Sequence, residues 1–401
     1  MKILTLMNIS NEQDLACDSG YIFQRVLAKE LTQRGCEYHV AGAKCPAFCE
    51  INNGFFEKHY ISSGTNRYSS RYNFNFEEFA QLIQNVNPDV VFNCQIELTA
   101  AIKSVLETLK VNIPLIAYCH YPALWDKSLG KSNGPVIDQT LNNGHVGYNI
   151  LFNVITSVIT ADAVVTQSNY ARSLLEDAIK FYKIPYKNKI RVIAPPIDNE
   201  LFCGFNIYKK SEHSQSFLYN HRLYKSYGSE EFIKFGRQMI KSCKLECMIS
   251  DCMPNRSANR AVLNGSPEYF KSLLQKTKGF SVVNGNVARN TYRANILRNL
   301  FAVAAFRKSC VWSMAAIDCL CLGVPVIAPD YASYAEFIPK DLLFRNTSEA
   351  IEIVRRIQTD EDFRNNVSDK SFTLAKKFGA DKTVSAFIKL FEREISKKCV
   401  A

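Results

Sequence analysis

Ser313–Glu336 reads SMAAIDCLCLGVPVIAPDYASYAE, and this stretch predicts a helix, a tight turn and a buried strand. The helix is nearly apolar as far as Leu322, and Gly323 follows where a helix C-terminus favours a left-handed residue. Pro325 prevents the helix from continuing, and Val324–Ala328 is an apolar run typical of a strand buried on both faces. The stretch therefore indicates an α/β protein with a parallel sheet.

Asp318 is the one charged residue of this predicted helix. Burying an ionised carboxylate without a partner costs several kcal/mol or more, so the side chain needs donors. A vicinal diol such as the ribose of a nucleotide can donate to both carboxylate oxygens. The alternative is that Asp318 faces solvent or accepts a bond from a nearby serine or backbone amide.

Length and composition indicate a soluble protein of two domains. The chain has 401 residues, 47% of them hydrophobic and 22% charged, and it lacks an apolar run of the ~20 residues that a membrane span needs. Its N-terminus, MKILTLMNISNEQD, has too short an apolar run for a secretion signal and predicts a first strand. The fourteen cysteines form no CxxC pair, so we expect neither a cysteine zinc site nor an oxidising compartment. These features favour a cytoplasmic location.

The charge is uneven along the chain. The net charge is +11, and ten Lys or Arg residues face a single acid between positions 256 and 308. Such an excess favours an anionic partner, whether a nucleotide, a nucleic acid or an acidic membrane surface. The alternative is a solvated basic face.

The first half opens with a predicted strand, Lys2–Met7, and a helix from about Tyr21. Ser19 and Gly20 stand at the junction between loop and helix, where backbone N–H groups can bind an anion or a sugar hydroxyl. Farther on, His120 follows the predicted strand at 114–118, at the strand end that lines the ligand crevice of an open α/β sheet. It could bind a phosphate or a sugar hydroxyl, or serve the structure alone.

The second half repeats the pattern of strand, loop and helix. A strand at 217–219 leads into Asn220 and a loop carrying Arg222 and Lys225, with Ser229 capping the next helix. Two cations beyond a strand can neutralise the diphosphate of a nucleotide, and arginine can do so bidentately. A long helix is predicted at 288–305. We also assign Gly285, after another strand, and Glu336 to donor binding.

The paired prolines at 195–196 and the polar run that follows predict a domain boundary. We expect an N-terminal Rossmann-like acceptor domain at 1–200, a linker at 201–216, and a C-terminal nucleotide-sugar domain at 217–380. A final helix at 381–401 could pack back on the N-terminal domain.

Four segments in order resemble those of the retaining GT-B glycosyltransferases, in the glycogen-synthase-like group 1 branch. They are ADAVVTQSNYARSLL, VIAPPIDNELF, NHRLYK followed by Gly228, and CLGVPVIAP. The resemblance implies two Rossmann-like domains facing across a cleft, a nucleotide-sugar donor, a UDP-sugar by preference, and no metal or other cofactor.

The resemblance also implies roles for single residues. Arg222 and Lys225 match the pair that holds the donor diphosphate, and Asp318 matches the second acid of a two-glutamate motif that binds the donor ribose. The first glutamate would fall at Cys310 and is missing. His120 matches a histidine near the transferred sugar, whereas Gly20 matches a glycine-rich loop only loosely.

The acceptor is indicated by the basic excess and by the Asn-His-Arg form of the phosphate loop, which resembles glycosyltransferases that modify bases in tRNA. Together they favour a nucleic-acid acceptor such as a hydroxymethylated base in phage DNA, in the cytoplasm of a bacterium or an infected host. The contacts are expected from four arginines, Arg256, Arg260, Arg289 and Arg293.

Three alternatives stay open. The first is an acceptor that is an envelope glycan or a small molecule. The second is a catalytically silent scaffold that binds nucleotides or nucleic acid. The third is a nucleotide-sugar epimerase of the same fold, which would need further acids in the cleft.

Overall fold

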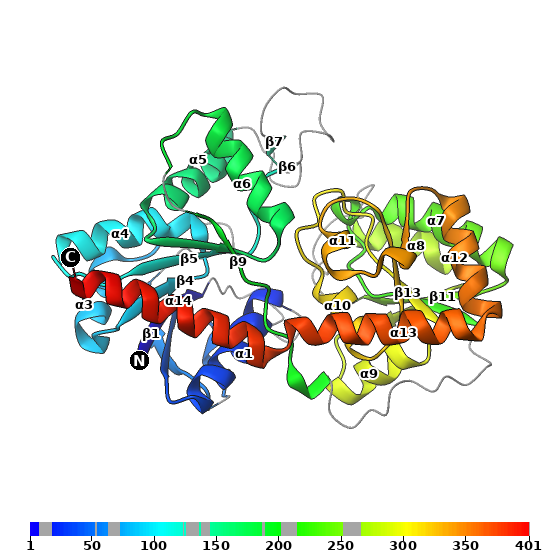
Figure 1. Ribbon diagram of the computed structural model, residues 1–401, viewed down its shortest axis with the longest axis horizontal. Coiled ribbons are helices and arrows are strands. Elements are labelled where there is room, and N and C mark those ends of the chain that lie inside the picture. The colour runs from blue at the N-terminus through cyan, green and yellow to red at the C-terminus, as the bar shows by residue number, and fades with distance from the viewer. Residues whose placement is uncertain are drawn as a thin grey trace. The chain divides into compact units, whose positions relative to one another are not determined.

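The computed structural model describes residues 1–7, 18–52, 54–62, 73–122, 124–125, 136–137, 145–186, 189–201, 215–251 and 266–400. The chain folds into two compact units (Figure 1). Unit 1 comprises Met1–Pro196 and Ala380–Ala401, and unit 2 comprises Ile197–Gly379.

Unit 1 is built on a parallel sheet in the order β3-β2-β1-β4-β5-β8-β9. Its strands are β1 Lys2–Met7, β2 Glu37–Gly42, β3 Glu57–Tyr60, β4 Val90–Asn93, β5 Leu115–Cys119, β8 Ala163–Thr166 and β9 Arg191–Val192. A small antiparallel pair, β6 Leu124–Trp125 and β7 Val136–Ile137, stands apart from it. The helices are α1 Ser19–Gln33, α2 Pro46–Cys49, α3 Phe76–Val86, η3 Ile96–Leu98, α4 Thr99–Thr108, α5 His145–Thr160, α6 Asn169–Phe181 and α14 Ala380–Val400.

Successive residues of the central strands bury opposite faces of this sheet. Ile3 and Phe92 pack in one core with α1 and α14, whereas Leu4 and Val91 pack in the other with α3 and α4. A parallel strand covered on both faces has an apolar sequence with no polar alternation, as these strands have.

The C-terminal helix α14 is part of unit 1 (Figure 1, red). Phe387 has no exposed surface, and its ring centroid lies 5.4 Å from that of Phe92 and 5.8 Å from that of Tyr118. At the far end of the helix the Lys398 ammonium pairs with Asp162 at 2.8 Å. The helix thus supplies core side chains to a sheet that the first half of the chain builds.

We expect Phe387→Ala to destabilise the protein by about 3–5 kcal/mol, because it removes a fully buried ring from this cluster. Denaturant unfolding of the full chain measures the effect. Lys389→Ala, at an exposed position of the same helix, is the matched control and should change stability by less than about 0.5 kcal/mol. Equal stability of the two variants would mean that α14 is not a core element.

Unit 2 is built on a second parallel sheet, in the order β12-β11-β10-β13-β14-β15. Its strands are β10 Ser216–Tyr219, β11 Glu246–Asp251, β12 Phe280–Asn284, β13 Phe301–Val303, β14 Val326–Pro329 and β15 Leu343–Phe344. The helices are η6 Asn199–Leu201, η7 Lys225–Tyr227, α7 Ser229–Cys243, α8 Pro267–Gln275, α9 Arg289–Leu297, α10 Met314–Cys321, α11 Tyr334–Phe337, η8 Lys340–Leu342, α12 Thr347–Thr359, α13 Glu361–Ala375 and η9 Lys376–Phe378.

The stretch that predicted the fold has the expected local structure. Helix α10 is followed by Gly323 with φ of 71°, and then by the buried strand β14. The Ser313 hydroxyl caps the helix by accepting from the Ala316 N–H at 3.2 Å. Left-handed glycine and proline therefore end this helix for the reasons that the sequence suggested.

The long helix predicted at 288–305 is wrong. In the structure α9 ends at Leu297 and residues 301–303 form β13, a central strand beside β10. The Asn299 amide donates to the Asn295 carbonyl at 2.6 Å where the helix ends. Periodicity cannot separate a short apolar strand from a buried helix segment, and here the strand prevails.

The observed units differ from the expected boundaries by a few residues. Ile197 and Leu201 bury in the core of unit 2, so the change of unit falls after Pro196 and not after residue 200. Most of the expected linker, residues 202–214, lies outside the described residues.

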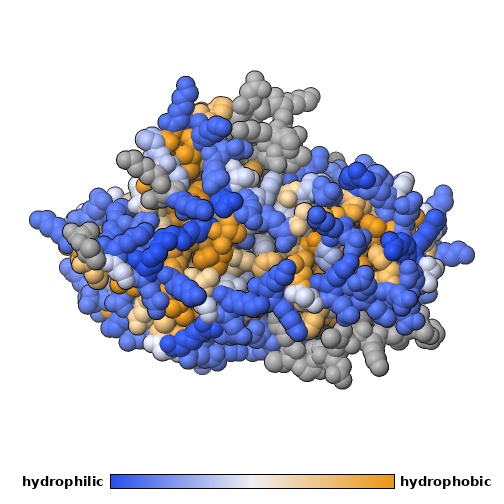
Figure 2. Space-filling model, in the orientation of Figure 1, coloured by the Kyte–Doolittle hydropathy of each residue, from blue (hydrophilic) through white to orange (hydrophobic). Residues whose placement is uncertain are grey.

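The surface is mostly hydrophilic on the face in Figure 2, with hydrophobic residues reaching it over α5 and α6. Three apolar side chains of α5 and α6 are well exposed, Phe152 at 49%, Ile159 at 41% and Phe181 at 46%. Among the residues described, none of the helices combines the length and the apolar character that crossing a membrane would require.

Candidate nucleotide-sugar site

The strand order of unit 2 reverses between β10 and β13. Both β11 and β13 pair with β10, so the chain connections leave β10 and β13 in opposite directions. In open parallel sheets, ligands bind at this switch point, beyond the carboxyl ends of the strands. The loops that line it here are residues 220–228 after β10 and 304–313 after β13.

The two loops pack directly on each other at Gly228. This residue has φ of 71°, and a Cβ placed on it would lie 2.6 Å from the carbonyl oxygen of Phe306. Only glycine fits both the left-handed backbone and this close approach. The packing fixes the β10 loop against the β13 loop at the edge of the sheet.

Arg222 and Lys225 lie in the β10 loop, as predicted. Arg222 is partly buried, whereas Lys225 is exposed at the start of η7. Their neighbour His221 carries no charge near neutral pH, because burial and the Arg222 guanidinium lower its pKa to about 3. The positive charge of this loop therefore comes from Arg222 and Lys225.

Arg307 is a third cation at this edge, and the sequence interpretation missed it. Its guanidinium lies 5.0 Å from the ring centroid of Tyr227, so this positive charge of the β13 loop lies against the β10 loop. It follows β13, which was taken for part of a helix. Recognising Phe301–Val303 as a strand would have placed Arg307 at the carboxyl edge with Arg222.

Asp318 forms part of a hydrogen-bonded chain of three side chains. The Tyr292 hydroxyl donates to Asp318 Oδ2 at 2.8 Å, and the Asn220 amide donates to the Tyr292 oxygen at 2.6 Å. Asp318 lies on α10, Tyr292 lies on α9, and Asn220 follows the end of β10. The partly buried carboxylate thus finds a hydroxyl donor from another helix, an alternative that the sequence interpretation did not consider.

Arg289 pairs with Asp198 beside this chain. Its guanidinium lies 3.5 Å from Asp198 Oδ2 and 5.6 Å from the Tyr292 ring centroid. Arg289 was predicted to contact the nucleic-acid acceptor, but it stands among the proposed donor residues. Asp198 belongs to the Pro-Pro-Ile-Asp turn and is another member that the sequence interpretation missed.

Burial raises the pKa of Asp318, and nearby Asp198 adds to the rise. The Arg289 charge and the Tyr292 hydroxyl oppose that shift. The site therefore keeps a carboxylate that is costly to ionise without further donors. A ligand offering two hydroxyl groups would relieve that cost.

Cys310 stands where the resemblance expects a glutamate, and it is buried beside Ser333 and Tyr334. The residue is 4% exposed, and burial raises the pKa of its thiol. Its Sγ contacts the Trp312 carbonyl oxygen at 3.6 Å. The position therefore carries no charge, and the end of the site next to it lacks the acid of the motif.

The first-unit residues lie at the carboxyl edge of the other sheet. The ring of His120 lies edge-on to Phe23 and Tyr118, at centroid distances of 4.8 and 4.7 Å. Burial lowers its pKa to about 4, so it is neutral near pH 7. Its Nε2 is buried and has no hydrogen-bond partner in the described part of the chain.

Ser19 and Gly20 were predicted in a loop, but they form the first turn of α1. The Asp18 carboxylate accepts from the Gly20 and Tyr21 N–H groups, both at 3.0 Å. A negative charge already occupies this helix N-terminus, so these N–H groups are not offered to a phosphate.

The remaining predicted residues are scattered. Gly285 follows the edge strand β12, its N–H donating to the Asp251 carbonyl at 2.8 Å, and so lies two strands from β10. Glu336 is partly buried in α11, and Arg293 is partly buried in α9. Arg256 and Arg260 lie outside the described residues.

The comparisons with known proteins agree with this architecture. Residues 24–201 match the model of Glycosyltransferase Family 4. No curated protein matches the sequence. The prediction of a glycosyltransferase is confirmed at the level of this domain.

Solved structures resemble the whole chain. Sucrose-phosphate synthase from Thermosynechococcus elongatus is 14% identical, with 99% of each chain covered and a TM-score of 0.71. Anabaena Alr3699/HepE, solved in complex with UDP-glucose, is 12% identical over 98% of this chain and 100% of its own, with a TM-score of 0.68. Trehalose-6-phosphate synthase OtsA is 11% identical over 98% and 99%, also with a TM-score of 0.68. The chain thus has the GT-B glycosyltransferase fold of two Rossmann-like domains, and its residues 24–201 form a domain that matches Glycosyltransferase Family 4.

Proposed function

We propose that the protein is a retaining glycosyltransferase that uses a UDP-sugar and binds it at the switch point of unit 2. The observation that carries the proposal is the placement of Arg222 and Arg307 on two mutually packed loops, in the same unit as the Asp318–Tyr292–Asn220 chain. Cations suit the diphosphate and the carboxylate suits the ribose diol. The UDP-glucose complex of Alr3699/HepE supports the choice of UDP.

The chemistry asks for leaving-group stabilisation more than for a strong base. The bond between the anomeric carbon and the diphosphate oxygen breaks, and a bond to the acceptor oxygen forms on the same face of the sugar. The acceptor proton passes to the departing phosphate oxygen. Fixed cations and N–H groups that face the developing charge stabilise such a transition state by a few kcal/mol each.

His120 fits a binding role in this scheme and not that of a proton carrier. A neutral imidazole, with its pKa lowered to about 4, can form a hydrogen bond with a sugar hydroxyl but does not carry a proton near pH 7. With Cys310 neutral, the motif supplies no carboxylate nucleophile. The proposed mechanism needs none.

For the acceptor we favour a glycan or a small sugar, which offers a hydroxyl group to the donor. We also expect the acceptor to carry an apolar part that contacts unit 1. Sucrose-phosphate synthase and trehalose-6-phosphate synthase, by their names, form sugar products. The exposed Phe152, Ile159 and Phe181 on α5 and α6 support an apolar portion of the acceptor, such as a lipid carrier.

A hydroxymethylated DNA base is the second candidate acceptor. It is favoured by four exposed cations in unit 2, Lys276, Lys278, Arg298 and Lys308. Two other cations of the basic region weaken this candidate, because Lys271 pairs with Asp251 at 2.8 Å and Arg289 pairs with Asp198.

Incubation with a panel of nucleotide-sugars tests the proposal. We expect UDP release that glycan or lipid-linked sugar acceptors accelerate, with a product whose anomeric configuration by NMR matches that of the donor. Inverted configuration would contradict retention. If the protein neither bound UDP-, ADP- and GDP-sugars nor released nucleotide from any of them, the proposal that it is a glycosyltransferase would be contradicted.

The DNA candidate has its own test. Sugar incorporated into hydroxymethylated DNA would establish it, and DNA affinity should then fall at least about tenfold between 50 and 300 mM salt, because phosphate contacts release counterions. Affinity independent of salt, without incorporation, would leave the glycan acceptor.

A further inference from the structure

A cluster of metal-ligating side chains lies in unit 1, on the sheet edge formed by β2 and β3. The parallel register places His39 opposite Glu57 and Ala41 opposite His59. Tyr38 and Val40, the neighbours of His39, bury in the core with α1 and α14, so His39 lies on the other face of the strand. Residues opposite each other share a face, so His39, Glu57 and His59 meet there.

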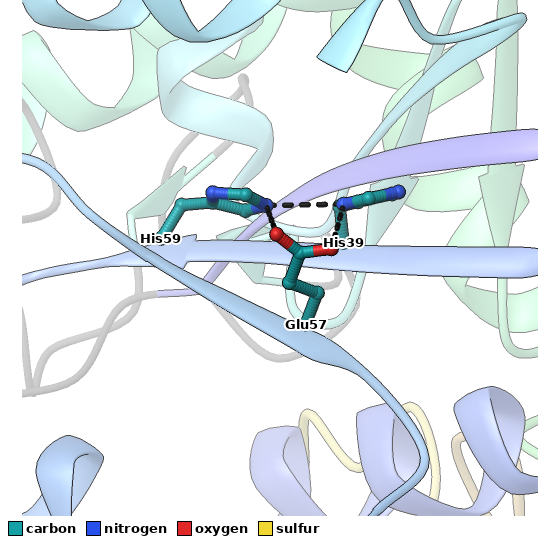
Figure 3. A group of neighbouring side chains, drawn as sticks. All are labelled: His39, Glu57 and His59. Carbon is teal, nitrogen blue, oxygen red and sulfur yellow. Dashed lines mark hydrogen bonds and ion pairs between the residues drawn. The ribbon is translucent and has the colours of Figure 1, made fainter. Parts of the chain in front are cut away.

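The three side chains face one another (Figure 3). His39 Nδ1 lies 3.0 Å from His59 Nε2 and 3.5 Å from Glu57 Oε2, and His59 Nε2 lies 3.7 Å from Glu57 Oε1. Ligands of a tetrahedral zinc ion, each about 2.0–2.1 Å from the metal, are spaced roughly 3.3 Å apart. The three observed separations bracket that value.

The surroundings suit ligation as well as the distances do. When Nδ1 of His39 is a ligand, the ring proton resides on Nε2. This atom is buried, has no hydrogen-bond partner among the described residues and lies 3.8 Å from Glu37 Oε2. A carboxylate beyond the far ring nitrogen is the usual outer partner of a metal-bound histidine.

The cluster is partly exposed, so a metal ion could reach it from the solvent. The side chains of His39 and His59 are 10% and 18% exposed, whereas that of Glu57 is 66% exposed. The two imidazoles are therefore largely enclosed, and the Glu57 carboxylate lies on the solvent side of them. The alternative is a hydrogen bond between the two imidazole rings. It would explain the 3.0 Å separation of the ring nitrogens but not the approach of Glu57 to both of them.

We propose that His39, His59 and Glu57 bind a divalent transition-metal ion, zinc most readily, with water in the fourth position. Imidazole and carboxylate together suit zinc better than magnesium or calcium, which prefer oxygen ligands alone. The ion would fasten the edge strand β3 to β2. It takes no part in glycosyl transfer, and the proposal is independent of the function proposed above.

The full-length protein, stripped with chelator and titrated with zinc, tests this site. We expect one equivalent to bind by calorimetry and to raise the melting temperature. His59→Ala should abolish both effects, and Glu57→Gln, at an exposed position that leaves the core intact, should weaken binding at least tenfold. The cobalt-loaded protein should have d–d absorption bands without a thiolate charge-transfer band.

The chain has fourteen cysteines, so a thiol site is the rival that needs a control. Cys49→Ser removes an exposed thiol on the neighbouring α2 and should leave zinc binding unchanged. Zinc binding that survives both His59→Ala and Glu57→Gln, or a wild-type chain that binds none, would overturn the proposal.

Discussion

Replacing Arg222 by alanine is expected to lower kcat/KM by a factor of about 10²–10³, the usual cost of removing one group that stabilises developing charge in a transition state. Arg222 is partly buried in the β10 loop, where a guanidinium can hold a phosphate bidentately. Steady-state UDP release with a saturating acceptor measures the effect. A change within about threefold would remove Arg222 from the proposed mechanism.

Matched variants separate this effect from a general loss of charge. Lys241→Ala removes an exposed cation of the same unit and should leave kcat/KM within about twofold, in keeping with weak surface charges. Arg222→Lys keeps the charge but loses the two parallel hydrogen bonds of a guanidinium, so partial rescue is expected. If Lys241→Ala were as damaging as Arg222→Ala, the overall positive field would be the cause.

Asp318→Asn is expected to weaken UDP binding by roughly 10- to 100-fold, because hydrogen bonds to a charged group contribute about 1.5–3 kcal/mol. The same variant should be no less stable than the wild type near neutral pH. Burial raises the pKa of Asp318 in the folded chain, so folding favours the protonated form. As pH rises through that raised pKa, the ionised group costs stability, and asparagine avoids the cost.

Calorimetric titration with UDP and denaturant unfolding at pH 5 and 8 measure the two effects separately. Asp369→Asn, at an exposed position of α13, is the control and should change neither. Unaltered UDP affinity in Asp318→Asn would mean that the ribose does not contact this carboxylate. A large loss of stability at pH 8 would mean that the ion is needed for folding.

The sequence predicted the α/β architecture because its strands are buried on both faces and its helices end at glycine and proline. Gly323 and Pro325 mark one such end, and the structure has the turn there. The same reasoning failed at residues 301–303, where a short apolar strand follows a helix without a glycine or proline between them. Only pairing with β10 and β14 decides that these residues are a strand.

The sequence was sufficient to predict the charged residues of the site, but not the hydrogen bonds that they form. Arg222, Lys225 and Asp318 could be chosen because a cation in a strand-to-helix loop and a lone acid on an apolar helix are local signals. Tyr292 and Asp198 give no such signal. They are 26 and 120 residues from Asp318 in sequence, and the fold alone makes them its neighbours.

The histidine cluster was missed for a similar reason. β3 has only four residues, EKHY, and none of its side chains is buried, so neither periodicity nor composition distinguishes it from a loop. Sequence spacing identifies metal ligands that stand close together in the chain, such as cysteine pairs. His39 and His59 come together through strand register, which links positions 20 residues apart.

The most direct test is a crystal structure of the protein with UDP bound. We predict that the diphosphate lies within about 3 Å of the Arg222 guanidinium, beyond the carboxyl ends of β10 and β13, as charge-assisted hydrogen bonds require. The ribose hydroxyls should donate to the Asp318 carboxylate. A diphosphate bound away from that edge, or a ribose that leaves Asp318 bonded to Tyr292 alone, would contradict the account.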